Sequence, residues 1–101
     1  MITTIIGVKV ALKSGRSYAD VAEIIAEFKE VESVYLTSGD HDLMIIVNFT
    51  DTKQVGEFVS KKLSVINGVE SVSTHFIMER YKQSGEILTV KQKDDRGLFT
   101  I

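Results

Sequence analysis

Hydrophobic and polar positions alternate with a period of two in four segments of the chain, which predicts four β-strands. In the first segment every second residue is apolar, from Ile6 to Leu12. The first and third segments are the most apolar, so we expect them to lie at the centre of a sheet. The four segments are residues 5–12, 31–37, 43–49 and 69–78.

Between these segments, apolar residues recur at spacings of three and four, which predicts two amphipathic helices. The first helix begins at Ser17, which has Asp20 at the capping-box position, and runs to Glu30. The second follows Asp51, a favourable N-cap residue, and ends at Gly68, which can adopt the left-handed conformation common at helix C-termini.

The predicted order is β-α-β-β-α-β. Two right-handed crossovers that share a central hairpin give a four-stranded antiparallel sheet with both helices on one face. We therefore predict an α+β fold of the ferredoxin-like type. Because this architecture hosts many functions, function must be argued from particular residues.

The face of the sheet that carries no helix is predicted to be apolar. Met44 and Ile46 point away from the helices, and Ile5 and Ile77 are positioned to join them. Burying one such side chain contributes about 1.5–3 kcal/mol. We therefore expect a second sheet to cover this face in a dimer; a monomer that tolerates a few exposed apolar residues is the alternative.

The pattern of residues near the C-terminus predicts a β extension. Alternation over residues 87–91 follows a turn at Ser84-Gly85, and a second turn signal lies at residues 94–97. A hairpin arm that docks on a neighbouring subunit suits this pattern; a partly unstructured end is the alternative. We divide the chain into a domain of residues 1–79 and an extension of residues 80–101.

Composition excludes several classes of function. The net charge is −2, and twelve scattered basic residues interleave with fourteen acidic ones, so we expect no direct contact with nucleic acid. The chain has no cysteine, which excludes disulfides and cysteine-based zinc sites. No apolar run reaches the roughly 20 residues of a membrane span, and the N-terminus lacks a signal-peptide pattern, so we expect a cytoplasmic protein.

The sequence offers little for catalysis. His41 and His75 are the only side chains suited to acid–base chemistry near neutral pH, and no activated nucleophile or phosphate-binding loop accompanies them. Asp40, His41 and Asp42 are consecutive, so their side chains alternate in direction rather than converge on a metal. We predict no catalytic residue, no metal and no cofactor.

The segment Gly39-Asp40-His41-Asp42 has two interpretations. It is a hairpin turn, with glycine for a positive φ and aspartate for local hydrogen bonds. It is also suited to a small polar pocket, in which backbone N–H groups hold a carboxylate and an aspartate holds an ammonium group. An amino acid presents both groups. Local chemistry alone favours the plain turn.

Two longer segments resemble a known family. Residues 34–44 (VYLTSGDHDLM) resemble the strand–turn–strand hallmark of the effector-binding (RAM) domain of the Lrp/AsnC (feast/famine) transcriptional regulators. Residues 66–74 (INGVESVST) resemble the helix end and last strand of that domain. The resemblance covers residues 5–78.

This resemblance implies the fold derived above, a dimer formed through the sheets (the dimeric α+β barrel type), and rings of eight or ten subunits. It also implies that amino acids or related metabolites bind between dimers near the turn. The contacts carried over are Gly39, Asp40 and Asp42, with Thr74 of the last strand as a wall of the pocket; His41 replaces the usual aromatic residue.

Full-length members of the family carry a helix-turn-helix domain ahead of this one, whereas this chain starts directly at the first strand. We therefore expect a stand-alone sensing and oligomerisation module of transcription regulation, which could assemble with full-length regulators. The alternatives are a small dimeric α+β barrel enzyme of the oxygenase or isomerase type, with its catalytic groups between sheet and helices, and an ACT-like amino-acid-binding module.

Overall fold

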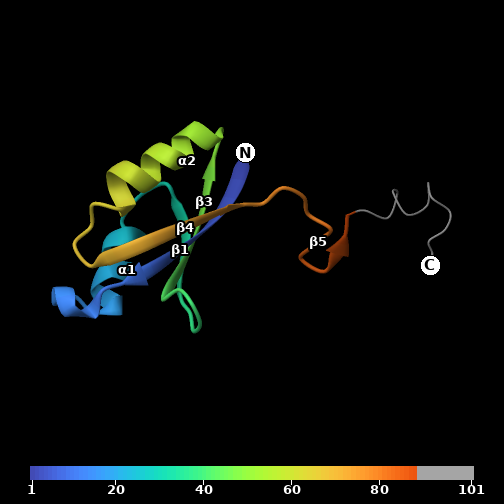
Figure 1. Cartoon of the computed structure of the whole chain (residues 1–101). Coiled ribbons are helices and arrows are strands. Elements are labelled where there is room, and N and C mark those ends of the chain that lie inside the picture. Colours follow the sequence, from blue (N-terminus) through green and yellow to red (C-terminus); the bar gives the residue numbers. More distant parts are fainter. Residues whose placement is uncertain (89–101) are drawn as a thin grey trace.

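The computed structural model describes residues 1–88; residues 89–101 lie outside the description. Nearly all of the described elements belong to one α+β unit, and a small hairpin projects from it (Figure 1). The elements in chain order are β1 (Ile2–Val10), the 3-10 turn η1 (Leu12–Ser14), α1 (Tyr18–Ala26), β2 (Val31–Leu36), β3 (Leu43–Phe49), α2 (Thr52–Phe58), the π-helical turn η2 (Val59–Leu63), β4 (Val69–Phe76), β5 (Lys82–Gln83) and β6 (Glu86–Ile87).

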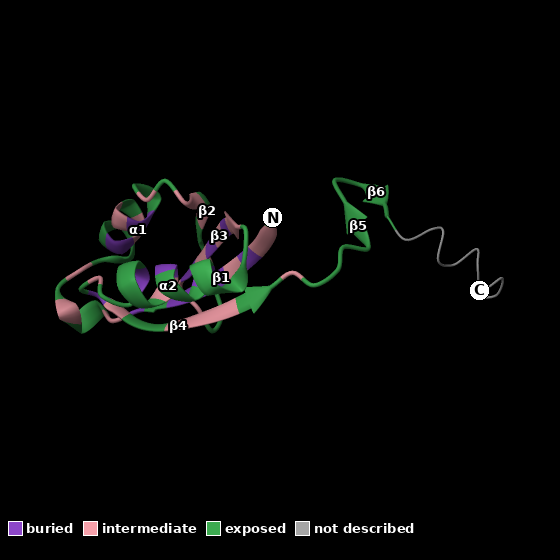
Figure 2. Cartoon of the chain, turned by 90° about the horizontal axis from the view of Figure 1, so that it is seen from above, coloured by how far each residue is buried: buried purple, intermediate pink, exposed green. Residues whose placement is uncertain are grey.

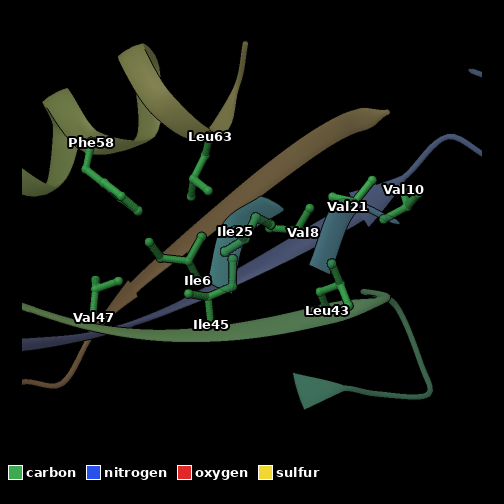
Figure 3. Close-up of a cluster of buried hydrophobic side chains, with 10 residues drawn as sticks. All are labelled: Ile6, Val8, Val10, Val21, Ile25, Leu43, Ile45, Val47, Phe58 and Leu63. Atoms are coloured by element: carbon green, nitrogen blue, oxygen red, sulfur yellow. The ribbon is translucent and has the colours of Figure 1, made fainter. Parts of the chain in front are cut away.

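The predicted ferredoxin-like fold is confirmed. The four main strands form one antiparallel sheet in the order β2-β3-β1-β4, so the two most apolar strands are central, as expected. Side chains from both helices meet one face of this sheet in a single core (Figure 3). The core side chains are Ile6, Val8, Val10, Val21, Ile25, Leu43, Ile45, Val47, Phe58 and Leu63.

Local signals place the helix starts correctly. The Ser17 hydroxyl accepts a hydrogen bond from the Asp20 N–H, and the Asp20 carboxylate accepts one from the Ser17 N–H. The Asp51 carboxylate likewise accepts a hydrogen bond from the Gln54 N–H. These bonds satisfy N–H groups that have no partner within the first turn.

The helix ends differ from the prediction. α1 ends at Ala26, four residues before the predicted end. α2 continues after Phe58 as a π-helical turn, with an i to i−5 hydrogen bond of 2.8 Å from Ser64 N–H to the Val59 carbonyl. Phe58 and Leu63 are five residues apart, and the wider turn keeps both of them buried against the sheet.

The first strand is also shifted. It starts at Ile2 and ends at Val10, so the prediction that it reaches Leu12 is wrong, and the Leu12 side chain is 54% exposed in η1. The register shifts between Lys9 and Val10, and the Ala11 N–H then bonds the Gly68 carbonyl at the helix-to-strand connection. This long-range bond draws the chain out of the alternating pattern.

The sheet face opposite the helices carries the expected apolar residues. The register places Ile5 opposite Ile46 and Gly7 opposite Met44 on this face. Ile77 follows on the same side, with its N–H bonded to the Thr3 carbonyl. We call this surface the open face; its apolar side chains are partly exposed in the single chain.

The described part of the C-terminal extension contains a short hairpin, which lies earlier in the chain than the predicted one. β5 and β6 pair across the turn at Ser84-Gly85, both of which have positive φ (51° and 84°). The hairpin points away from the sheet, and its residues are exposed (Figure 2). Most of the strand predicted over residues 87–91, and the whole turn predicted at residues 94–97, lie outside the described residues.

Candidate functional site

The turn between β2 and β3 is closed by hydrogen bonds across its base. The Thr37 N–H donates to the Asp42 carbonyl at 2.9 Å, and the Thr37 hydroxyl donates to the His41 carbonyl at 2.9 Å. Gly39 has φ +108°, and a Cβ built on it would meet nothing within 4 Å. Glycine is therefore favoured there by backbone conformation and not by space.

Asp42 attaches this turn to the central strand. Its carboxylate accepts a hydrogen bond of 2.8 Å from the Val10 N–H, and its own N–H donates to the Val8 carbonyl at 2.9 Å. One carboxylate oxygen is thus occupied at the end of β1. Asp42 therefore positions the turn on the sheet.

His41 lies against Gly7 on the open face. A Cβ at position 7 would stand 2.7 Å from Cγ, 2.8 Å from Cδ2 and 2.9 Å from Nδ1 of the His41 ring. Gly7 is buried, and no positive φ is recorded for it, so the ring and not the backbone conformation requires a glycine. Our prediction of site residues missed Gly7. The available signal was an isolated glycine inside a strand, which often marks a close approach.

Beside the turn lies an open hollow of about 390 Å³, lined by Thr37, Ser38, Asp40, His41 and Met44. Asp40 is exposed, so its carboxylate is accessible to an ammonium group. The Lys9 ammonium donates to the Asp40 carbonyl at 3.3 Å and brings a positive charge to the same region. Lys9 was not among the predicted site residues, since its proximity to the turn depends on strand pairing.

Thr74 is placed apart from the other predicted site residues. It pairs with Ile6 and therefore lies on the helix side of the sheet, whereas His41 covers Gly7 on the open face. The β4 residues that share the open face include Ser73 and His75, whose Oγ and Nε2 atoms are 3.1 Å apart. The single chain thus brings together the residues of the turn but not Thr74.

A second hollow, of about 260 Å³, opens between the helices and the edge of the sheet. Its lining includes Phe49, Phe58, Glu30 and Lys62. The hydrogen bond from Lys62 lowers the pKa of the Glu30 carboxyl, with burial acting in the opposite direction. Because an ion pair and aromatic side chains line this hollow, we interpret it as part of the packing between the helices.

Two further observations apply to residues 1–88 only. Within this part of the chain, no group of three or more His, Asp or Glu side chains is arranged to hold a metal ion. In the same residues, no helix is long and apolar enough to cross a membrane.

Comparison with known proteins identifies relatives over most of the chain. Residues 3–87 match the family model described as the Lrp/AsnC ligand binding domain, and this match includes the hairpin. The chain is 43% identical over 95 residues to the uncharacterized HTH-type transcriptional regulator YugG of Bacillus subtilis, covering 94% of this chain and 57% of that protein. It spans about half the length of the curated relatives that it matches.

Solved structures share the fold. The structure of TTHA0845 from Thermus thermophilus superimposes with a TM-score of 0.73 at 25% identity, covering 82% of this chain and all of that chain. The transcriptional regulator NMB0573 of Neisseria meningitidis, solved as a complex with L-Met, superimposes with a TM-score of 0.68 at 20% identity, covering 90% of this chain and 58% of that chain.

Proposed function

Because this chain belongs to the Lrp/AsnC family through its ligand-binding domain, we propose that it binds an amino acid or a related metabolite and self-assembles as the sensing module of a transcription regulator. One observation carries the proposal. The hollow beside the turn and the apolar open face share His41 and Met44, so a ligand in the hollow contacts the same side chains that a second subunit would cover.

The residues of the hollow suit the two charged groups of an amino acid. We propose that the Asp40 carboxylate binds the ammonium group and that N–H groups of the turn at Gly39, assisted by Lys9, bind the carboxylate. His41 and Met44 form the wall that contacts the ligand side chain. The L-Met complex of the NMB0573 protein supports this ligand class.

The proposed roles of Asp42 and Thr74 are indirect. Asp42 holds the turn through its bond to Val10, so its proposed role is to position the site. Thr74 lies on the other side of the sheet in the same chain. Its proposed role is to set the position of β4 through its pairing with Ile6.

For assembly, we propose a dimer that buries the open face, and rings of dimers as the family resemblance implies. Ile5, Ile46 and Met44 are partly exposed large side chains on that face, and burying them is the driving force. Assembly with DNA-binding regulators of the family is the proposed route to gene control. The low net charge of −2 supports a role for this domain without direct DNA contact.

YugG and NMB0573 are described as transcriptional regulators, and we propose that this chain binds its ligand without catalysis. The alternative, a dimeric α+β barrel enzyme, would place its reacting groups between the sheet and the helices. In the described residues this space is filled by core side chains, and the 260 Å³ hollow lies at its rim. A substrate converted there, with the turn left unoccupied, would favour the enzyme.

Native mass spectrometry with a panel of amino acids tests the proposal. We expect an even-numbered oligomer that retains at least one amino acid, and we expect Asp40→Ala to weaken this retention at least tenfold. Glu70→Ala is the matched control, because it removes an exposed carboxylate from β4 that does not line the hollow. A monomer that binds no amino acid, or equal loss in both variants, would contradict the proposal.

A further inference from the structure

The open face carries both histidines of the chain, His41 and His75. His75 lies on β4, opposite Ile5 of β1. The ring of His41 lies against Gly7, the next residue of β1 on the same face. Histidine is the side chain whose charge ordinarily changes between about pH 5 and 8. A face that we propose to be buried in a dimer therefore carries groups that gain charge in mildly acidic solution.

The surroundings of His75 suit a neutral imidazole. Its side chain is exposed in the single chain, and its Nε2 atom lies 3.1 Å from the Ser73 hydroxyl. Its cross-strand neighbour Ile5 is apolar and offers no opposite charge. Among residues 1–88, His75 forms no ion pair. An imidazolium at this position would therefore have a hydroxyl beside it but no counter-ion.

The charged groups nearest to His75 on the open face are positive. The Arg80 guanidinium donates a hydrogen bond of 2.6 Å to the Thr3 hydroxyl on β1, the strand beside β4. Lys9, at the other end of β1, pairs with a β4 residue on the same face. Both charges oppose the protonation of His75, because like charges repel.

The acidic groups of the region lie farther from His75. Glu70 and Glu79 are five and four residues away along the chain, which is roughly 13–17 Å in an extended segment. This distance exceeds the Debye length of about 8 Å at physiological salt. Glu32 belongs to β2 and Asp40 to the turn after β2, and β1 and β3 lie between β2 and β4.

His41 has the opposite environment. Asp40 and Asp42 are its neighbours in the chain, and both carry negative charge near its ring. These carboxylates favour the charged form of His41, so its protonation opposes burial less than that of His75. We therefore expect the sensitivity to acid to reside at His75.

The symmetry of a sheet-to-sheet dimer brings the two copies of His75 together. A two-fold axis across the strands stacks the open faces with their β1 strands antiparallel and with β4 above β4. The middle residue of β1 is Ile6, whose partner on β4 is Thr74. An axis through this pair places His75 of one subunit above Ser73 of the partner subunit. The two histidines then lie on either side of the axis, one position away from it.

We propose that His75 is a pH-sensitive contact of the dimer, which forms when both copies of His75 are neutral and separates when they are protonated. This inference rests on the proposed sheet-to-sheet dimer. Each imidazolium would lose hydration on the buried face and would meet a second imidazolium across the axis. Dimer formation therefore releases protons, so the dimer is favoured above the range in which histidine titrates and is weakened as the pH falls through it.

Sedimentation equilibrium of the full chain at pH 7.5 and at pH 5.5 tests the proposal. If each of the two copies must be neutral in the dimer, each one raises the dimer Kd about tenfold over this interval, and the pair about a hundredfold. We expect a measured rise of at least about tenfold. Circular dichroism at pH 5.5 checks that the separated subunits stay folded.

Substitutions of the two histidines assign the effect. His75→Gln keeps a polar side chain without a titrating group, and we expect its dimer Kd to change less than about threefold between the two pH values. His75→Leu is a second neutral replacement with the same expectation. His41→Gln is the matched control and is expected to retain a rise of at least about tenfold. The α-amino group, which also titrates near neutral pH, is common to all variants and cancels in the comparison.

The outcomes distinguish this inference from the proposed function. A wild type that binds an amino acid and whose dimer Kd is equal at both pH values overturns the pH-sensitive contact and leaves the proposed function intact. A rise that persists in both His75 variants, or loss of the dimer at pH 7.5 in both, also overturns the contact. A chain that is monomeric at every pH overturns both inferences. A rise that is abolished in both His75 variants and kept in His41→Gln supports the contact.

Discussion

Replacing Gly7 by alanine tests whether the ring of His41 is held against β1. The added Cβ would come within 2.7–2.9 Å of three ring atoms, where ordinary contacts begin at 3.4 Å. The ring must therefore retreat by about half an ångström or more. The backbone of His41 is restrained by the hydrogen bond from Thr37 to the His41 carbonyl and by the two hydrogen bonds of Asp42 to β1.

The expected cost follows from this geometry. Overpacking a closely packed site typically destabilises a protein by about 1–3 kcal/mol, and we expect Gly7→Ala to lower the free energy of unfolding by that amount. In a His41→Ala background, Gly7→Ala should leave the free energy of unfolding unchanged or raise it by up to about 1 kcal/mol. The reason is that the clash is gone and alanine restricts the unfolded chain more than glycine does.

Urea denaturation at one fixed protein concentration measures all four members of this double-mutant cycle, since unfolding of an oligomer depends on concentration. Gly56→Ala in α2 is the matched control: a Cβ there meets nothing within 4 Å, and helix propensity predicts stabilisation by about 1 kcal/mol. If Gly7→Ala costs the same with and without His41, the proposed packing of the ring on β1 is wrong.

Three other substitutions test the remaining structural arguments. Asp42→Ala should lower the free energy of unfolding by about 1–3 kcal/mol even without ligand, because it leaves the Val10 N–H without its partner; urea denaturation measures this, and no loss would contradict the positioning role. Thr4→Val should stabilise the fold by about 1 kcal/mol, because the fully buried Thr4 hydroxyl has no hydrogen-bond partner among residues 1–88; a lower thermal midpoint would show that it has one. The pKa of Glu30 is lowered in the folded state by Lys62, so its stabilising contribution is present above the ordinary glutamate range and is lost as the pH falls below about 5. Lys62→Met should reduce this loss between pH 7 and pH 3, and an unchanged pH profile would refute the pairing.

Most of the fold was predictable because its signals are local. Each helix start depends on a cap within three residues, at Ser17 and Asp51, and both caps form as expected. The strands show their alternation in the sequence itself. The errors occur where distant segments meet: β1 ends before Leu12 because the chain is drawn to Gly68, and α2 widens at Val59 because Phe58 and Leu63 must both face the sheet.

The candidate site was only partly predictable, for the same physical reason. The glycine at position 39 predicts a turn, and the order of the elements places that turn beside β1. The partners of the turn are 31–34 residues away in the chain: Lys9 reaches Asp40, Val10 binds Asp42, and Gly7 accommodates the ring of His41. Which residues become neighbours depends on the register of β1 against β3, and this register cannot be predicted from a local sequence pattern.

The sequence by itself determined the element order, the caps, the turn glycine and the apolar character of the open face, because each follows from residues within a few positions of one another. Only the tertiary structure decided that Thr74 and His41 lie on opposite faces of the sheet. It also decided that the Asp42 carboxylate accepts a hydrogen bond from β1. The side of the sheet that a residue faces changes with a register shift of one position, so these relationships depend on the assembled sheet.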